Sequence, residues 1–315
     1  HFNLLREGLG AMDLNVALLT GSTKTAERKI IHSALEEGSM HILIGTHALI
    51  EDKVQFKNLG IAIIDEQHRF GVAQRAKLWR KNTLPPHVLV MTATPIPRTL
   101  AMSVYGDLDI SVIDELPPGR KSIKTVLRSD ANRLQVFKFI QEEIKLGKQI
   151  YIVYPLIQES EKMDYKDLTD GYESLVREFP LPDYRISIVH GQMKPKDKDF
   201  EMQRFIEGKT QLMVATTVIE VGVNVPNASV MIIESAERFG LSQLHQLRGR
   251  VGRGNDQSYC ILMSGVKKSK EATTRLKTMV QTNDGFEIAE VDLRLRGPGD
   301  IMGTQQSGVL KFKIA

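Results

Sequence analysis

Residues 61–68 read IAIIDEQH, four apolar residues followed at once by two acids, an amide and an imidazole. The apolar run predicts a strand buried on both faces, as parallel strands are. In open α/β sheets, ligands bind outside the carboxyl ends of the strands. We therefore expect Asp65 to hold Mg²⁺, directly or through water, and Glu66 to orient and deprotonate an attacking water. A solvated turn at a strand end is the alternative for an acidic pair taken by itself.

The same alternation of short apolar runs with helical stretches extends over most of the chain, and it predicts an α/β fold with parallel sheets. Strands are expected at residues 16–20, 41–45, 61–65, 88–92, 122–127, 149–154, 185–190, 211–215, 229–234 and 258–263. Helices are expected at residues 25–37, 132–146, 196–206 and 241–247.

Length and composition set outer limits. The 315 residues predict about two domains, and 42% hydrophobic with 25% charged residues is ordinary globular composition. The net charge is 42 − 38 = +4, which permits an anionic partner without identifying one. A single cysteine, Cys260, excludes a disulfide scaffold and a cysteine-based zinc site, and it suits a reducing cytosol. The sequence holds no apolar run of the length that a membrane span needs.

Domain boundaries are expected at two places. The sequence PPGR at residues 117–120 cannot continue a helix or a central strand, so a first unit is expected at residues 1–120 and a second at 121–265. Residues 266–315 form a third part, with a basic helical stretch, a turn at 283–285, a short helical run to Leu293 and a Gly-, Gln- and Arg-rich end.

Residues 246–253 read QLRGRVGR and form the most specific basic pattern in the chain. Arg250 and Arg253 are three apart, so they share one face on a helix or tight helical turn. Gly249 and Gly252 leave room for a phosphate or another backbone. Guanidinium groups that reach a γ-phosphate act as arginine fingers. A solvated basic helix end is the alternative.

Three further motifs end predicted strands. They are TATP at residues 92–95, VHG at 189–191 and ATTVIEVGVNVP at 215–226. Their hydroxyls, imidazole and exposed backbone N–H groups suit contacts to phosphates. Each motif alone is weak evidence of a function, and the order of the motifs along the chain is the stronger evidence.

That order matches motifs II, III, V and VI of superfamily 2 helicases, and the chain more narrowly resembles the RecG family of ATP-dependent DNA helicases, which remodel stalled forks and branched junctions. The resemblance implies two RecA-like lobes, the first incomplete, followed by a small C-terminal helical hairpin and loop. It is carried by DEQHRFGVAQ at residues 65–74, MTATPIPRTLAM at 91–102, YGDLDISVIDELPPG at 105–119, ERFGLSQLHQLRGRVGRG at 237–254 and DLRLRGPGDIMG at 292–303.

The resemblance implies ATP and Mg²⁺ as cofactors, with Asp65 as the Mg²⁺ carboxylate and Glu66 as the catalytic base. It also implies nucleotide-site roles for His68, Gln246, Arg250 and Arg253, with the last three meeting the ATP phosphates across the cleft. Gly222 and Asn224 would lie by the sugar and phosphates of the nucleotide. Many relatives carry Asp at the position of Asn224, and Asn keeps the hydrogen bonding without the charge.

The partner that the resemblance implies is branched DNA, including forks and Holliday junctions, acted on by a monomeric motor in the bacterial cytosol, with single-strand-binding protein as a further partner. Contacts to the DNA backbone would come from Gly21, Ser22, Thr46, His47, His190, Gly191, Thr216 and Thr217. Coupling residues would be Thr92 and Thr94, together with Arg294, Arg296 and Gln305 of the element called TRG, which converts lobe closure into movement along duplex DNA.

The phosphate-cradling Walker A loop is absent from the sequence. Residues 21–25 (GSTKT) do not fit it, because Thr23 precedes Lys24 and Leu18 occupies the earlier glycine position. The resemblance places a DNA-wedge domain, the adenine-recognition segment, motif I and most of motif Ia before His1. We therefore expect residues 1–315 alone to lack ATPase activity, and the first lobe, without its P-loop strand, to expose an open sheet edge.

Two alternatives stay open at this point. The transcription-repair coupling factor shares the TATP stretch and the C-terminal motor element, but it needs a polymerase-binding module, and none is apparent in the sequence. For these residues alone, the third hypothesis is a non-catalytic DNA-binding module.

Overall fold

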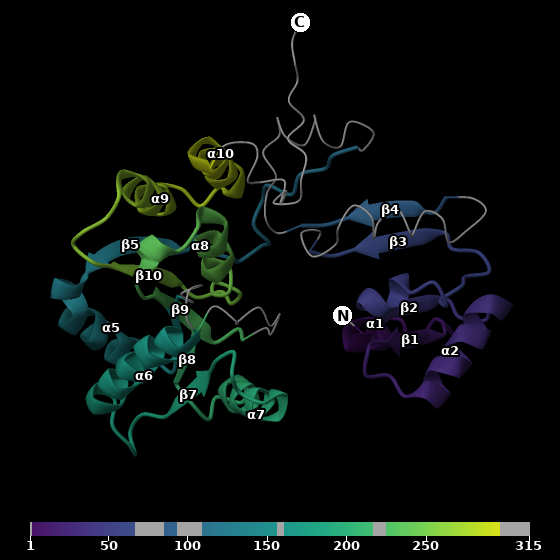
Figure 1. Ribbon diagram of the computed structural model, residues 1–315, viewed down its shortest axis with the longest axis horizontal. Coiled ribbons are helices and arrows are strands. Elements are labelled where there is room, and N and C mark those ends of the chain that lie inside the picture. Colours follow the sequence, from purple (N-terminus) through teal and green to yellow (C-terminus); the bar gives the residue numbers. More distant parts are fainter. Residues whose placement is uncertain (1, 67–84, 93–108, 156–160, 217–224, 297–315) are drawn as a thin grey trace, which may run out of the picture. The chain divides into compact units, whose positions relative to one another are not determined.

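The computed structural model describes residues 2–66, 85–92, 109–155, 161–216 and 225–296. The chain forms two compact units, residues 1–93 and 94–315, and each is described by itself. Both units contain parallel sheets (Figure 1), so the predicted α/β class is confirmed. The finer division at residues 120 and 265 stays a prediction.

Unit 1 consists of two separate pairs of parallel strands with their helices. β1 (Val16–Leu19) pairs with β2 (Ile42–Gly45), and β3 (Ile61–Ile64) pairs with β4 (His87–Val90). Its helical elements in the described ranges are α1 (Phe2–Gly8), α2 (Thr25–Glu37) and η1 (His47–Ile50). A small core around β1 and α2 buries Leu19, Ile31, Leu35, Ala48 and Val54.

The sequence predicted that β3 is buried on both faces, but one face of the β3–β4 pair is partly exposed. Ile61 and Ile63 are 56% and 59% exposed, and Leu89 on the paired strand is 48% exposed. The register places these three side chains on one face of the pair, and each keeps about half of its surface exposed. The expectation of an open sheet edge in this lobe stays a prediction.

Gly45 permits the close pairing of β1 with β2. A Cβ atom at this position would lie 2.0 Å from the carbonyl oxygen of Leu19, its partner in the register. Backbone at that distance cannot move aside without separating the strands. The sequence that ends β2 therefore needs glycine for a steric reason.

Unit 2 is built on a six-stranded parallel sheet in the order β5-β10-β9-β6-β8-β7. The strands are β5 (Lys124–Ser129), β6 (Gln149–Tyr154), β7 (Ile186–Val189), β8 (Leu212–Thr216), β9 (Ala228–Ile233) and β10 (Tyr259–Ser264). The helices are α5 (Arg133–Lys145), α6 (Glu161–Glu178), α7 (Pro195–Ile206), α8 (Leu241–Arg248), α9 (Lys270–Gln281) and α10 (Gly285–Arg296), with η3 (Asp130–Asn132) and η4 (Ala236–Arg238).

Each face of this sheet carries its own core. Along β6, Tyr151 and Val153 join one cluster with side chains of α7, α8, α9 and α10, whereas Ile150 and Ile152 join another with α5 and α6. Successive side chains of a strand point to opposite faces, so an uninterrupted apolar run buries both. The apolar runs of unit 2 therefore form parallel strands as predicted, with β5 and β7 at the two edges of the sheet.

The C-terminal helices form the predicted hairpin. Ser269 caps α9 by accepting a hydrogen bond from the N–H of Ala272 at 3.1 Å, and Asp284 accepts one from the N–H of Phe286 at 2.8 Å at the start of α10. Both helices pack against α8. No helix in the described ranges has both the length and the apolar character that a membrane span requires.

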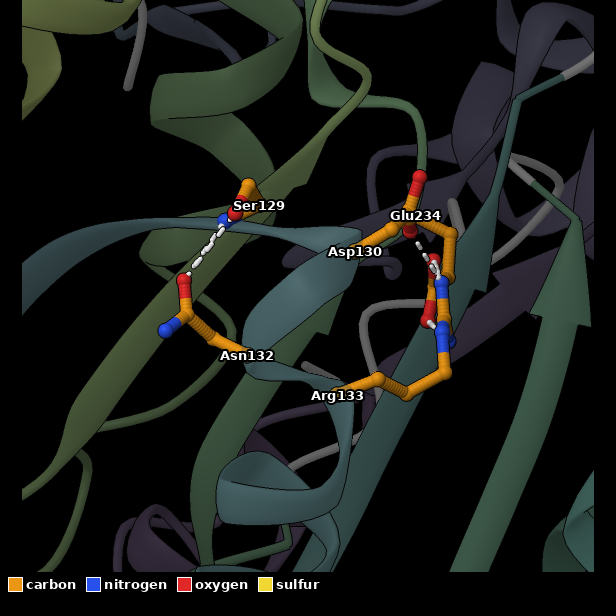
Figure 2. Close-up of polar contacts among 5 residues, drawn as sticks. All are labelled: Ser129, Asp130, Asn132, Arg133 and Glu234. Atoms are coloured by element: carbon orange, nitrogen blue, oxygen red, sulfur yellow. Dashed lines mark hydrogen bonds and ion pairs between the residues drawn. The ribbon is translucent and has the colours of Figure 1, made fainter.

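An ion pair fixes the carboxyl ends of β5 and β9 relative to α5. Figure 2 shows Arg133 of α5 facing Glu234, which follows β9, and Asp130. Arg133 donates to the two carboxylate oxygens of Glu234 at 2.8 and 2.9 Å and to Asp130 Oδ1 at 2.8 Å. The hydrogen bond to Glu234 raises the pKa of Arg133 more than its burial lowers it. Beside this pair lies a polar cavity of about 290 Å³.

Candidate functional site

The acidic residues of unit 1 lie where β3 ends. The N–H of Met91 donates to the carbonyl oxygen of Ile64 at 2.8 Å, which continues the parallel pairing past both strands. Asp65 and Glu66 therefore lie beside Thr92 at the carboxyl ends of β3 and β4, as predicted. His68 and Thr94 lie outside the described residues.

Glu66 has an uncommon backbone conformation. Its φ is 54°, in the left-handed region that costs a non-glycine residue about 1–2 kcal/mol. Its N–H donates to Asp65 Oδ1 at 2.9 Å, and this local bond helps to hold the turn. Strain of this kind gathers at functional sites, so the conformation agrees with the role expected of Glu66.

The carboxylate of Asp65 suits a Mg²⁺ ion that is held together with substrate phosphates better than a metal ion that is held by protein side chains alone. Its side chain is exposed at the strand end, and no group of three or more His, Cys, Asp or Glu side chains in the described residues could hold a metal ion. Mg²⁺ keeps several waters and is commonly bound by one or two carboxylates together with substrate phosphates.

The residues of unit 1 that are predicted to bind DNA lie together at the carboxyl ends of β1 and β2. β1 and β2 pair with Leu19 opposite Gly45, so the segments that follow them lie side by side. Gly21, Ser22, Thr46 and His47 are all exposed there. The Ser22 hydroxyl lies 3.0 Å from that of Thr20, which orders the loop after β1. Exposed hydroxyls and backbone N–H groups at a common edge can donate to phosphate oxygens.

Unit 2 repeats this arrangement at β7 and β8. Val189 pairs with Ala215, so His190 and Gly191 lie beside Thr216. Thr216 is 2% exposed, and its hydroxyl has no hydrogen-bond partner among the described residues. Burial, with a smaller contribution from Lys198, lowers the pKa of His190 and so favours its neutral imidazole. Thr217, Gly222 and Asn224 fall outside the described part of the chain.

The two arginines follow α8 rather than lying within it. Hydrogen bonds from the N–H of Arg250 to Leu247 and from Val251 to Arg248 continue the turn, and Gly252, with φ 76°, ends it. We call residues 249–254 the arginine loop. Of the two alternatives, helix or tight helical turn, the structure has the turn.

The side chains of the arginine loop lack a counter-charge. Neither Arg250 nor Arg253 makes a side-chain hydrogen bond or ion pair with any residue that the structure describes. Burial is the main cause that lowers the pKa of Arg253, followed by repulsion from Arg250 and Arg120. Half-buried cations that repel one another form a field that attracts an anion.

The charges of the arginine loop also act on Tyr151. Burial raises its pKa to about 12, and the nearby guanidinium groups of Arg253 and Arg250 oppose that rise. The loop leads into the amino end of β10. At the same end of the sheet, the backbone N–H of Lys124, the first residue of β5, donates to the carbonyl oxygen of Ser258. The arginine loop thus lies toward the amino ends of the strands, whereas His190 and Thr216 lie at the carboxyl ends.

Gln246 and the C-terminal residues are placed only in part. Gln246 lies on α8, half-buried and one helical turn before Arg250. Arg294 is exposed on α10, where its Nε donates to the carbonyl oxygen of Glu290 at 3.4 Å. Arg296 ends α10, but its side chain is outside the description, as is Gln305 entirely.

Sequence reasoning missed Arg248. Its guanidinium, 2% exposed, donates to the carbonyl oxygens of Met279 at 3.0 Å and Thr282 at 2.9 Å, and to His245 Nδ1 at 3.1 Å. These bonds join α8 to the end of α9. A signal was present, because Arg248 continues the buried spacing of Leu241 and Leu244 along one helix face.

A second missed residue joins α8 to α10. Asp292, 4% exposed, accepts a hydrogen bond from the Ser242 hydroxyl at 3.0 Å. Both helices of the C-terminal hairpin are therefore anchored by polar bonds to the helix that leads into the arginine loop.

Family models match three parts of the chain. Residues 1–103 match the DEAD/DEAH box helicase model, residues 134–255 the helicase conserved C-terminal domain, and residues 282–315 the model described as ATP-dependent DNA helicase RecG, domain 3, C-terminal. The curated protein "ATP-dependent DNA helicase RecG" of Synechocystis sp. is 53% identical over 315 residues, 100% of this chain and 38% of its own length. Over its whole length, the chain is similar to RecG.

Other comparisons agree. The RecG of Escherichia coli K12 is 48% identical over 319 residues, covering 100% of this chain and 46% of its own length. The chain thus spans less than half the length of these curated relatives. A solved structure of RecG bound to a three-way DNA junction superposes with a TM-score of 0.76 at 45% identity, over 96% of this chain and 39% of that one.

A more distant structure shares the fold alone. The DUF1998 helicase MrfA bound to DNA has a TM-score of 0.64 at 19% identity, over 88% of this chain and 42% of its own. The parallel-sheet architecture is therefore that of helicase motor lobes, as expected from the order of the motifs. The curated relatives named above are RecG helicases, which favours a motor of the RecG type over the transcription-repair coupling factor.

Proposed function

We propose that this chain is the motor part of an ATP-dependent DNA helicase that remodels branched DNA, such as replication forks and Holliday junctions. The observation that carries the proposal is the arginine loop, where Arg250 and Arg253 lack an acidic partner among the described residues and repel each other. A polyphosphate supplies the charge that this loop needs. Homology to RecG over the whole chain supports ATP as that polyphosphate and DNA as the substrate.

The nucleotide supplies the bond that is hydrolysed, and Mg²⁺ supplies charge neutralisation at its phosphates when both are bound. Asp65 is the carboxylate that holds the metal, and Glu66 orients a water and accepts its proton. Arg250 and Arg253 donate hydrogen bonds to phosphate oxygens, and their charge stabilises the charge that develops in the transition state. Gln246 assists at the phosphates, and Gly222 and Asn224 contact the sugar side.

The DNA-binding residues act through the backbone of the nucleic acid. Gly21, Ser22, Thr46 and His47 in unit 1 donate to phosphates from the edge where β1 and β2 end. In unit 2 the same role falls to His190, Gly191, Thr216 and Thr217. The neutral imidazole of His190 donates a hydrogen bond without adding charge, and the buried hydroxyl of Thr216 gains a partner. Contacts of this kind position a protein on DNA without reading the base sequence.

Coupling between hydrolysis and movement runs through α8 in this proposal. Arg248 and Asp292 tie the hairpin α9–α10 to α8, so a shift of the arginine loop on phosphate binding displaces the hairpin that carries Arg294 and Arg296. Gln305 acts on the DNA beyond that hairpin. Thr92, Thr94 and His68 link the acidic site of unit 1 to the DNA. A monomeric motor in the bacterial cytosol, with single-strand-binding protein as a further partner, completes the proposal.

The test uses the full-length protein that carries these residues and a synthetic replication fork. Wild-type protein is expected to convert the fork in an ATP-dependent manner. Glu66→Gln, which removes the base and keeps the side-chain shape, is expected to bind the fork and leave it unconverted. Glu142→Gln, an exposed carboxylate on α5, serves as the matched control. Fork conversion by Glu66→Gln at the wild-type rate would refute the proposal, and capture of RNA polymerase in a pull-down would favour the coupling factor.

A further inference from the structure

The PPGR sequence at residues 117–120 forms a turn that delivers an arginine. The N–H of Arg120 donates to the carbonyl oxygen of Pro117 at 3.1 Å, and Gly119 has φ 82°. Proline at the second position and a glycine with positive φ at the third are what a type II turn requires. The turn therefore sets the direction in which Arg120 leaves the backbone.

Arg120 reaches the arginine loop. Its Nε donates a hydrogen bond of 2.7 Å to the carbonyl oxygen of Gly252, 132 residues away in the chain. Gly252 is the residue whose φ of 76° ends the turn between Arg250 and Arg253. The bond thus holds the backbone at the point that sets the relative direction of the two arginine side chains.

Neighbouring contacts fix the two segments against each other. A Cβ atom on Gly252 would lie 2.9 Å from Ile123 Cγ1, and one on Gly119 would lie 3.2 Å from Asn255 Oδ1. The side-chain amide of Gln257 donates to the carbonyl oxygen of Ser122 at 2.9 Å. The turn and the loop are therefore packed closely enough to transmit small displacements.

The charges at this place are all of one sign. Arg120, Arg250 and Arg253 are half-buried, and both neighbours help to lower the pKa of Arg253 by repulsion. Asp256, which follows closely in the chain, is paired with Lys148 instead. Among the described residues, none of the three guanidinium groups has an acidic partner. Gathering three such cations is unfavourable unless an anion joins them.

We propose that Arg120 is a positioning residue for phosphate binding, which holds the Gly252 carbonyl so that Arg250 and Arg253 face one polyphosphate and which adds a third positive charge there. The inference rests on the proposed function, because it takes the anion of the arginine loop to be the polyphosphate of a nucleotide. It goes beyond that function in giving the Pro117–Arg120 turn a part in the phosphate site.

The test measures binding of inorganic tripolyphosphate to the 315-residue chain by calorimetry. Arg120→Ala is expected to lower the affinity about tenfold, the effect of losing one charge-assisted hydrogen bond. Arg120→Lys keeps the charge without the Nε geometry, and we expect an intermediate loss of about threefold. Arg128→Ala removes an exposed arginine of β5 that bonds only to a neighbouring carbonyl, and it is expected to bind as the wild type does.

A double-mutant cycle separates positioning from general loss of structure. If Arg120 acts through the loop, adding Arg120→Ala to Arg253→Ala lowers the affinity by less than the tenfold loss seen in the wild-type background. A merely structural role would lower the melting temperature and give additive losses. Should Arg120→Ala fail to fold, Arg120→Lys decides in its place, with the same cycle against Arg253→Ala.

The outcomes distinguish this inference from the function on which it rests. Wild-type affinity in Arg120→Ala, or in Arg120→Lys where that variant decides, overturns the role of Arg120. If Arg250→Ala and Arg253→Ala still weaken binding in that case, the phosphate site itself stands. No binding of tripolyphosphate to the wild-type chain would overturn both.

Discussion

The guanidinium of Arg248 in α8 donates a hydrogen bond to the carbonyl oxygen of Met279 in α9, 3.0 Å away. Met279 lies in the last turn of α9, where carbonyl oxygens have no partner within the helix. Arg248 also bonds to Thr282 just past that end, so its positive charge lies at the negative pole of the helix. A buried arginine with no acidic partner is stabilised here by carbonyl groups.

Replacing Arg248 should destabilise unit 2. Arg248→Met keeps the apolar stem but leaves the carbonyl oxygens of Met279 and Thr282 buried without a donor, so we expect a loss of about 2–4 kcal/mol in the free energy of unfolding. Urea denaturation followed by circular dichroism measures it. Arg128→Met, at an exposed site, should change the unfolding free energy by less than about 0.5 kcal/mol. Equal stabilities of the two variants would contradict the role given to Arg248.

His245 should make unit 2 sensitive to mild acid. Burial first, and then the charge of Arg248, lower its pKa from 6.5 to about 4. Between pH 6.5 and 4, His245 takes up a proton in the unfolded chain but not in the folded chain. The contribution of His245 to the free energy of unfolding is therefore complete above pH 6.5 and is lost as the pH falls toward 4. Because the side chain is only half-buried, we expect about 2 kcal/mol rather than the full value.

The measurement compares His245→Gln with the wild type. Glutamine can accept the hydrogen bond from Arg248 but does not titrate, so its unfolding free energy should fall less between pH 6.5 and 4. Carboxylates contribute equally to both proteins and cancel in the difference. Parallel curves for the two proteins would show that His245 is not held neutral.

Gly45 should be intolerant of even a methyl group. Gly45→Ala places a Cβ atom against the Leu19 carbonyl oxygen, so the β1–β2 pair must separate, and we expect a loss of about 2–4 kcal/mol. Hydrogen exchange of the amides of β1 would report the opening directly. Gly60→Ala is the control, since nothing lies within 4 Å of its added Cβ. Similar protection of β1 in both variants would argue against the close approach.

Most strands of unit 2 could be predicted from the sequence because they are uninterrupted apolar runs. Ile150–Val153 read as buried on both faces and are buried by the two clusters that flank the sheet. Helix α6 was not among the expected helices, although residues 161–178 have the apolar periodicity of an amphipathic helix. In unit 1, Ile61 and Ile63 were expected to be buried, but burial depends on neighbours that a local pattern does not contain.

The relative positions of candidate residues could be predicted where a motif ends a strand, but not where a contact joins distant segments. Asp65 beside Thr92 and His190 beside Thr216 follow from parallel pairing. The bond of Arg120 to Gly252 joins residues that no local pattern relates, and PPGR was interpreted as a boundary alone. Arg248 could have been noticed from its spacing with Leu244, but the carbonyl groups that receive it belong to another helix.

The 315 residues alone should bind DNA without hydrolysing ATP. They contain no Walker A sequence to hold the β- and γ-phosphates, whereas the strand-end hydroxyls and the basic side chains are present. Affinity for a forked duplex should fall with salt by a slope of several phosphate contacts. Phosphate release above background that disappears in Glu66→Gln would contradict the expectation for hydrolysis.

The central claim is that the arginine loop binds the phosphates of the nucleotide that drives the motor. The most direct measurement is DNA-stimulated ATP turnover by the full-length protein with Arg250→Ala, Arg253→Ala and the exposed control Arg128→Ala. We predict a fall in kcat of about 100-fold or more for each loop variant, with DNA binding retained and the control unchanged. Normal DNA-dependent turnover in both loop variants would contradict the account.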